Sequence, residues 1–346
     1  MKRDGGILVV GPAWVGDMVM CQSLFITLRR RHPDARIDVL APDWTRPLLE
    51  RMPEVSEALP LQVEHGRLRP LAQWRAVREV RRRGYRQAIV TRRSLKSALV
   101  PFLAGVPERT GILGENRHWL INDVRAVNGE SHRWAVERLA VLGMEPGAAP
   151  GLDGVPWPKL VANAEAGAEA ERRLGADGAG SVVGLAPGAA YGPAKRWPQA
   201  HWEQLAAALT RSGRRVWVFG AAGERDEGEA IAAAGGPGAT SLCGHTSLGE
   251  VADLMARCEA VVSNDSGLMH VAAAAGPRVI ALFGSTSPAN TPPLDPRARV
   301  IYRALECSPC YARTCPLGHL RCLTEITVDE VLAHLEEGAQ ASEELA

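Results

Sequence analysis

The sequence predicts an α/β protein built from two doubly wound parallel sheets. Short apolar runs alternate with amphipathic stretches, an order typical of parallel sheets covered by helices on both faces. The alternation is interrupted by a segment rich in Pro, Gly and Ala between Met144 and Pro158, which indicates a linker. A length of 346 residues also exceeds what one hydrophobic core usually holds. We therefore expect two domains, 1–157 and 158–346, the second with a terminal helix.

The first half begins with a strand and a loop that opens a helix. Ile7–Val10 is an apolar run of strand length, and the loop after it leads into a helix from about Asp17 to Arg30. The other elements expected before the linker are strands 37–40 and 88–90 and helices 71–83 and 94–104.

The same rhythm restarts after the linker. The expected elements are helix 161–174, strand 182–186, helix 201–212, strand 216–219, strand 261–262, helix 268–275, strand 279–283 and a last helix that begins near 327. Thr327 and Glu330 have the spacing of a capping box, which supports that start. Ligands of doubly wound sheets bind at the carboxyl ends of the strands, so the loops there are the candidates for function.

Charge is balanced overall but uneven along the chain. The formal net charge is +1, so no basic excess argues for nucleic acid. Basic residues crowd the first third: Arg67, Arg69, Arg75, Arg78, Arg81, Arg82, Arg83, Arg86, Arg92, Arg93 and Lys96. They indicate either a positive face for an anionic partner or a helix face that is simply solvated. With no visible signal peptide and no apolar stretch of membrane-spanning length, we expect a cytoplasmic protein, at most peripheral to a membrane.

The most informative stretch is Ser263–His270. It follows a short apolar run and opens a helix of small residues, so it predicts a strand, a tight polar turn and a helix start. Unpaired N–H groups and the positive end of the helix dipole favour an anion there, and Gly267 leaves room for a phosphate. The alternative is an ordinary helix cap that binds nothing.

Three more loops after predicted strands carry polar residues. In Gly11–Met18 two glycines have nearly the spacing of a P-loop, but Asp17 stands where a phosphate-binding cation would be. A carboxylate about 4 Å from a phosphate would cost roughly 4 kcal/mol at an effective dielectric near 20, so Asp17 suits a proton acceptor or a plain cap better. Lys195 and Arg196 can bind a diphosphate, and Glu224 can accept hydrogen bonds from ribose hydroxyls. The alternative for each is an ordinary charged side chain on the surface.

Several motifs stand together in the order and spacing of one family. They are Trp14–Met18, Lys96–Phe102, Arg109–Gly111, Pro187–Ala189, Gly192–Pro198 and Asn264–His270. From about Ile7 to Leu335 the chain resembles glycosyltransferase family 9, the ADP-heptose:lipopolysaccharide heptosyltransferases.

The resemblance implies a fold, a reaction and a set of residues. The fold would be GT-B, with two Rossmann-like domains facing each other across a cleft, the first binding a lipopolysaccharide acceptor and the second ADP-heptose. The reaction would invert the anomeric carbon, with Asp17 as the general base. Donor contacts would be Lys195, Glu224, Asp265, Ser266, Gly267 and His270. Acceptor contacts would be Lys96 and Arg109, which lie in family motifs, with Arg92, Arg93 and Arg117 as further candidates.

The type of acceptor can be narrowed further. Trp14–Met18 and Lys96–Phe102 favour the type II activity, which acts on Kdo2-lipid A that already carries one heptose. The alternatives are heptosyltransferase I or another sugar-nucleotide enzyme on the same architecture, such as an epimerase. An acceptor of this kind also implies contact with the inner face of the inner membrane.

Four late cysteines are not explained by this reading. Cys307, Cys310, Cys315 and Cys322 lie close together among turn residues, and disulfides are disfavoured in a cytoplasmic chain. Four thiols at short spacing suit a structural zinc, although the spacing is not that of a standard finger. The alternatives are reduced thiols that pack a loop, or a zinc-dependent interaction module without enzymatic activity. The transfer reaction itself requires no metal or other cofactor.

Overall fold

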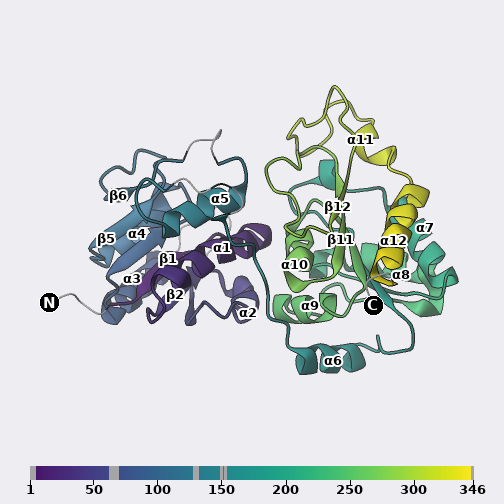
Figure 1. The fold of residues 1–346 in the computed structure, drawn as a ribbon, viewed down its shortest axis with the longest axis horizontal. Coiled ribbons are helices and arrows are strands. Elements are labelled where there is room, and N and C mark those ends of the chain that lie inside the picture. The colour runs from purple at the N-terminus through teal and green to yellow at the C-terminus, as the bar shows by residue number, and fades with distance from the viewer. Residues whose placement is uncertain (1–4, 62–69, 128–131, 149–150, 152–153, 344–346) are drawn as a thin grey trace. The chain divides into compact units, whose positions relative to one another are not determined.

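Two compact units make up the chain (Figure 1). The computed structural model describes residues 5–61, 70–127, 132–148, 151 and 154–343. One unit is Met1–Lys159 and the other Leu160–Ala346, a division two residues beyond the boundary expected from the linker. Each unit contains one six-stranded sheet whose paired strands are all parallel.

The sheet of the first unit has the order β3-β2-β1-β4-β5-β6. Its strands are β1 (Ile7–Val10), β2 (Ile37–Ala41), β3 (Glu57–Pro60), β4 (Gln87–Val90), β5 (Glu108–Gly111) and β6 (Asp123–Val124). Its helices are α1 (Val15–Arg31), α2 (Arg46–Leu49), α3 (Pro70–Arg83), α4 (Leu95–Leu103) and α5 (Ala135–Ala140). Successive strand residues point to opposite faces, and Leu8 and Val10 pack with the buried sides of α3 and α4.

The sheet of the second unit has the order β12-β11-β10-β7-β8-β9. Its strands are β7 (Val182–Ala186), β8 (Arg215–Val218), β9 (Ala239–Ser241), β10 (Ala260–Asn264), β11 (Arg278–Phe283) and β12 (Arg299–Tyr302). Its helices are α6 (Ala164–Arg173), α7 (Gln199–Arg211), α8 (Arg225–Gly235), α9 (Leu248–Met255), α10 (Gly267–Ala275), α11 (Arg321–Thr324) and α12 (Val328–Glu343). Trp197 and Trp202 meet edge to face in its core, with ring centroids 5.0 Å apart.

The structure confirms the two doubly wound sheets, because both have the strand order of a Rossmann-like fold. Every strand and helix expected from the sequence is present within a few residues, and Thr327 accepts a hydrogen bond from the main-chain N–H of Glu330 at 3.2 Å. The described residues between 144 and 163 form no α-helix or strand. The elements that the sequence did not reveal are mostly short, and β5, with the sequence Glu-Arg-Thr-Gly, carries no apolar run that would mark a strand.

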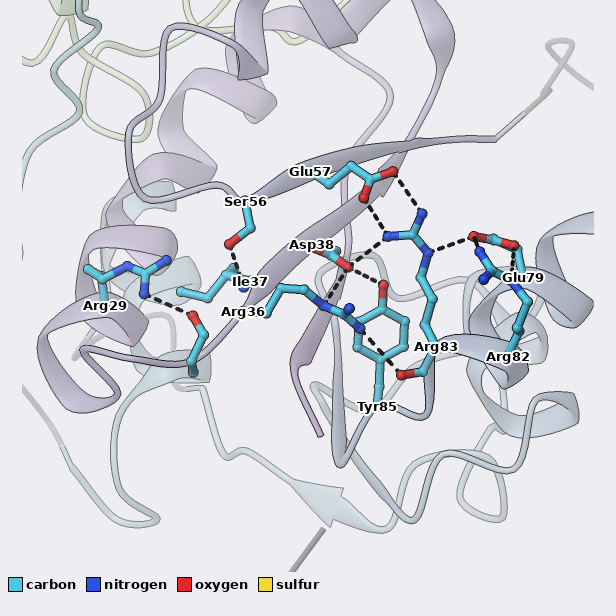
Figure 2. Close-up of polar contacts among 11 residues, drawn as sticks. Arg29, Arg36, Ile37, Asp38, Ser56, Glu57, Glu79, Arg82, Arg83 and Tyr85 are labelled. Carbon is cyan, nitrogen blue, oxygen red and sulfur yellow. Dashed lines mark hydrogen bonds and ion pairs between the residues drawn. The ribbon is translucent and has the colours of Figure 1, made fainter. Parts of the chain in front are cut away.

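A buried charge cluster closes the amino end of the first sheet (Figure 2). Asp38 is fully buried at the start of β2 and accepts hydrogen bonds from the Tyr85 hydroxyl and from Arg83, at 3.3 Å for Arg83. Arg83 also donates two bonds to the Glu57 carboxylate, at 2.6 and 2.7 Å, and one to Glu79 at 2.6 Å. A buried carboxylate is tolerable only when it is paired in this way.

Two arginines of the arginine-rich first third form ion pairs in this cluster. Arg82 and Arg83 both donate to Glu79, and these bonds lower the pKa of the Glu79 carboxyl to about 2. Both arginines are therefore matched by acidic partners near the amino end of the sheet. Arg67 and Arg69 lie outside the described residues.

Among the helices of the described residues, none combines the length and the apolar character that a bilayer crossing requires.

Candidate active site

Each sheet has one point at which the chain leaves in opposite directions from two neighbouring strands. In the second unit these strands are β7 and β10, and in the first they are β1 and β4. Loops that follow such a pair of strands lie beside each other at the carboxyl edge, where doubly wound proteins bind ligands. Most of the polar residues singled out from the sequence follow these four strands; Glu224 follows β8, and Arg109 and Arg117 lie in and after β5.

Asn264 joins the two loops of the second unit. It ends β10, is fully buried, and accepts a hydrogen bond on Oδ1 from the main-chain N–H of Trp197 at 3.1 Å. Its Nδ2 donates to the carbonyl oxygen of Pro187 at 2.5 Å. Both partners lie in the loop after β7, so one amide side chain holds that loop against the end of β10. Buried polar groups fully paired in this way fix a single arrangement.

Lys195 and Asp265 form an ion pair at this junction. The Lys195 Nζ lies 2.6 Å from Asp265 Oδ2, and the two side chains are 14% and 6% exposed. The hydroxyl of Thr286, in the loop after β11, donates to the same carboxylate oxygen. An ammonium has three donors. The bond to Asp265 uses one of them, which leaves two that could bind further acceptors.

The start of α10 lies directly beside this pair along the chain. Its N-cap residue is Ser266, whose side chain makes no capping bond to the first-turn amides and instead lies 3.4 Å from the hydroxyl of Ser263. Amides that no side chain caps, together with the positive end of the helix dipole, suit an anion. The helix terminus thus adds positive potential beside the Lys195–Asp265 ion pair.

His270 lies in the first turns of α10 and is 5% exposed. Burial is the main cause that lowers the pKa of its imidazole to about 4; the charge of Lys195 also lowers it and that of Asp265 opposes the shift. The ring is therefore neutral at pH 7, and the cationic group of this junction is Lys195. A neutral imidazole can still donate one N–H bond to a ligand.

Glu224 sits at the end of β8, in the short 3₁₀ turn Ala222–Glu224. Its carboxylate accepts hydrogen bonds from Arg196 at 3.0 Å and from the main-chain N–H of Ala221 at 2.8 Å. The carboxylate lies so close to Gly188 that a Cβ there would be 2.1 Å from Oε1, so a larger residue at this position would displace the Glu224 carboxylate. Arg196 is paired with Glu224 and also with Glu227 at 3.4 Å, whereas Lys195 is paired with Asp265.

The loop after β12 braces the loop that carries Lys195. The main-chain N–H of Ala194 donates to the carbonyl oxygen of Arg313 at 3.0 Å, and the Tyr191 hydroxyl donates to the carbonyl of Tyr311 at 2.7 Å. Lys195 Nζ and the Arg313 guanidinium lie 5.1 and 5.3 Å from the centroid of the Tyr191 ring. The loop of Lys195 is therefore positioned by residues more than a hundred positions away.

The first unit has the corresponding junction between β1 and β4. Asp17 is half-buried in the first turn of α1, directly after β1. Thr91, the first residue after β4, donates from Oγ1 to the carbonyl oxygen of Val10 at 2.9 Å and ties the two loops together. Burial, and then the charge of Asp17, raise the pKa of the Cys21 thiol one turn along α1. The Cys21 thiol is therefore protonated and carries no charge. The carboxyl group at this junction is that of Asp17.

The three exposed acceptor candidates also gather at this edge. Arg92 and Arg93 follow β4, and Lys96 lies in the first turn of α4. The Glu115 carboxylate caps α4 by accepting the main-chain N–H of Leu95 at 2.7 Å. All three cations are exposed and share the carboxyl edge with Asp17.

The other two candidates are engaged within the protein. Arg109 donates to the carbonyl oxygens of Leu120 at 2.7 Å and Val106 at 2.6 Å, and stacks over the Phe102 ring at 5.4 Å. Arg117 is fully buried and donates to the carbonyl oxygen of Ser94 at 3.1 Å, with burial lowering the pKa of its guanidinium. Any contribution of Arg117 to acceptor binding would therefore have to be indirect, through the start of α4.

The four late cysteines come together around one small cavity. Cys307, Cys310, Cys315 and Cys322 line it together with His319. Hydrogen bonds from main-chain N–H groups, that of Leu320 first, lower the pKa of the Cys315 thiol. Among the described residues, however, no three His, Cys, Asp or Glu side chains are arranged to hold a metal ion.

Sequence reasoning missed two contributors, Thr286 and Tyr191. Thr286 follows β11 in a Gly-Ser-Thr-Ser run, and small polar residues directly after a strand were a signal that could have found it. Tyr191 lies between the motifs Pro187–Ala189 and Gly192–Pro198, but its role depends on Arg313 and Tyr311, which no local pattern connects to it.

One doubly wound unit thus has a lysine beside an uncapped helix start, and the other has a carboxylate with exposed cations. Comparison with known proteins identifies the class. The profile of glycosyltransferase family 9 (heptosyltransferase) matches residues 73–321. Lipopolysaccharide heptosyltransferase 2 of Escherichia coli K12 is 42% identical over 95% of this chain and 97% of its own length. Lipooligosaccharide heptosyltransferase 2 of Haemophilus influenzae is 42% identical over 85% of this chain and 88% of its own.

A solved structure agrees with the sequence relatives. That of E. coli ADP-heptose lps heptosyltransferase II is 40% identical, with a TM-score of 0.86, and covers 98% of this chain and 99% of that chain. The chain belongs to glycosyltransferase family 9 and is a glycosyltransferase. The family expected from the motifs is thereby confirmed, and a non-enzymatic module is excluded.

Proposed function

We propose that the protein is a type II heptosyltransferase. It transfers L-glycero-D-manno-heptose from ADP-heptose to the first heptose of the lipopolysaccharide inner core, on Kdo2-lipid A, with inversion at the anomeric carbon. The observation that carries the proposal is Lys195 beside the uncapped start of α10 at the junction of β7 and β10. The relatives that align over most of the chain are named heptosyltransferase 2, which supports type II over type I.

On the donor side, the protein stabilises a leaving diphosphate. As the bond between the anomeric carbon and the phosphate oxygen breaks, negative charge grows on ADP. Lys195 and the first amides of α10 are held ready for that charge, Lys195 by its bond to Asp265 and the loop by Asn264. Such preorganised electrostatic stabilisation is usually the largest contribution to catalysis. Glu224 and His270 supply the polar groups for the rest of the nucleotide sugar.

On the acceptor side, Asp17 acts as the general base. It takes the proton of the attacking hydroxyl while that oxygen forms its bond to the anomeric carbon. The proton thus goes to Asp17, and the bonding electrons of the broken bond leave with ADP. The dipole of α1 favours the ionised carboxylate that this role requires, by roughly 0.3–1 kcal/mol. Lys96, Arg92 and Arg93 attract the phosphates and Kdo carboxylates of the acceptor.

The acceptor also determines where the enzyme works. A heptose acceptor on lipid A is anchored in a membrane, so we place the enzyme in the cytoplasm, in peripheral contact with the inner face of the inner membrane. ADP-heptose and Kdo2-lipid A carrying one heptose are its partners.

Mass spectrometry of acceptors incubated with ADP-heptose tests the proposal. We expect a gain of one heptose on Kdo2-lipid A that already carries its first heptose, and none on Kdo2-lipid A without it. Transfer only to the second substrate would assign type I instead. No transfer to either, with ADP-heptose consumed to another sugar nucleotide, would point to an epimerase.

A structural zinc at the four cysteines is a separate hypothesis. Its support is that all four thiols line one cavity on the loop that braces Lys195; its difficulty is that they are not arranged around a metal position. Elemental analysis of the purified protein decides it. One equivalent of zinc, lost in a Cys315→Ser/Cys322→Ser variant, would support it, and metal-free protein with full activity would reject it.

A further inference from the structure

One face of α3 is exposed and both basic and apolar. At about 100° per residue, its exposed members fall within an arc of about 120°. They are Leu71, Trp74, Arg75, Arg78, Arg81 and Arg82, which we call the α3 face. Leu71 and Trp74 are 78% and 56% exposed. Large apolar side chains at such exposure beside arginines are unusual on a helix that is merely solvated.

The opposite side of α3 fixes the orientation of this face. Ala76, Val77 and Val80 are buried and pack with Leu8 and Val10 of the sheet. The helix cannot rotate without exposing them, so the α3 face must point outward.

Most of the positive charge on the α3 face is not neutralised. Arg82 is matched by Glu79 (Figure 2), but Arg75 and Arg78 form no salt bridge with any described residue. Arg81 donates to the carbonyl oxygen of Leu103, a neutral partner that leaves its charge uncompensated. Arg75, Arg78 and Arg81 line one hollow of the surface, together with the paired residues Glu79 and Arg82. Three neighbouring arginines without an acidic partner among the described residues favour a polyanionic partner.

Exposed apolar side chains also lie near the other end of α3, on and beside the neighbouring helix α4. Arg81 reaches Leu103 at the end of α4, and α3 and α4 pack against each other. Leu103 is exposed there, and Trp119 is exposed while its ring meets Phe102 of α4 edge to face at 5.3 Å. The surface therefore combines exposed tryptophans with uncompensated arginines, the residue types enriched where proteins meet the membrane–water interface.

The topology relates this face to the reaction. α3 connects β3 to β4, which are parallel, so the helix runs back along the sheet and begins at the carboxyl edge. Leu71 and Trp74 are in its first turns. They therefore lie toward the edge that carries Asp17 and Lys96, where a lipid-anchored acceptor would have to arrive.

We propose that the α3 face is the surface by which the enzyme docks on an anionic lipid membrane. The proposal deepens the proposed function, because only a lipid-linked acceptor calls for such docking. Trp74 and Leu71 insert at the level of the headgroups, and Arg75, Arg78 and Arg81 meet lipid phosphates. Each basic residue near an anionic surface contributes about fivefold to membrane partitioning.

Vesicle binding tests this directly. The full chain is sedimented with vesicles of phosphatidylcholine alone or with a quarter of the lipid replaced by phosphatidylglycerol. We expect binding only to the second, weakened about 25-fold or more in Arg75→Gln/Arg78→Gln by the loss of two contacts. Arg172→Gln/Arg211→Gln is the matched control, because both of these arginines are exposed in the second unit, and it should bind like the unmodified protein.

Insertion is tested by fluorescence quenching with lipids brominated near the headgroup. Quenching should fall in Trp74→Phe relative to the unmodified protein. Equal vesicle binding of Arg75→Gln/Arg78→Gln and the control would overturn the assignment. Equal quenching in Trp74→Phe and the unmodified protein would also overturn it. A protein that binds neither vesicle would also overturn it, and a protein partner would then have to cover this face.

A deacylated acceptor separates this proposal from the proposed function. Turnover on a soluble core oligosaccharide that carries one heptose should be unchanged in Arg75→Gln/Arg78→Gln. A raised KM for that soluble acceptor would reassign the two arginines to acceptor recognition and refute docking. If the unmodified protein lacks this turnover but binds anionic vesicles, the proposed function fails while the surface assignment stands.

Discussion

Replacing Lys195 by alanine tests the donor site most directly. The change removes the ammonium that lies 2.6 Å from Asp265 and leaves in place Asn264, which holds the loop. The Asp265 carboxylate stays behind, only 6% exposed, with the Thr286 hydroxyl still donating to it. A diphosphate entering the variant therefore meets an acidic group in place of a balanced ion pair.

The magnitude follows from charge and distance. A unit charge about 4 Å from a phosphate is worth about 4 kcal/mol at an effective dielectric near 20. Loss of one preorganised group in a transition state typically costs about 10²–10³ in kcat. Because ADP carries its phosphates both before and after transfer, part of the loss appears in ground-state binding. We expect about tenfold to a hundredfold weaker ADP binding and about a thousandfold lower kcat/KM.

Calorimetry with ADP and steady-state kinetics measure the two parts separately. Lys159→Ala is the matched control, since Lys159 is exposed and lies in the first unit. Lys195→Ala/Asp265→Asn removes both charges, so it should recover part of the ADP affinity without restoring turnover. Thermal unfolding of each variant shows whether the fold is kept.

The reasoning fails if Lys195→Ala binds ADP as tightly as the control and turns over at the same rate. It also fails in part if the double variant binds ADP no better than the single one. Repulsion by Asp265 would then not be the cause of the loss.

Three further changes probe the remaining residues. Asp17→Ala should lose about 10²–10⁴ in kcat, the usual contribution of a general base, with ADP affinity unchanged by calorimetry; near-normal turnover would remove Asp17 from that role. Lys96→Ala should raise the KM for the acceptor and flatten its salt dependence, because exposed charges are screened over about 8 Å at physiological ionic strength; identical kinetics at low salt would contradict this. His270 has its pKa lowered to about 4 by burial, so its contribution to the free energy of unfolding is present above about pH 6.5 and is lost as the pH falls toward 4. Between about pH 6.5 and about pH 4, the free energy of unfolding, measured with denaturant, should therefore fall less in His270→Gln than in the unmodified protein. An equal fall with pH in both proteins would contradict the assignment.

The sequence by itself determined the architecture and the chemical character of the loops. Apolar runs of strand length and amphipathic helices are local patterns, so the strands Val182–Ala186 and Ile7–Val10 could be predicted without tertiary information. The polar turn after β10 could also be predicted from the sequence, because its residue types are typical of a helix start that suits an anion. The positions of Asp17 and Lys195 after predicted strands were enough to predict a general base in one unit and a phosphate site in the other.

Only the tertiary structure decided which charged side chains are available. Arg83 and Arg78 look alike in sequence, yet Arg83 is held by Glu57 and Asp38, 26 and 45 positions away, while Arg78 stays exposed. Likewise Arg109 and Arg117 are engaged by carbonyl oxygens of nearby loops. A pairing of this kind depends on which strands become neighbours in the sheet, and residue type and local spacing carry no information about that.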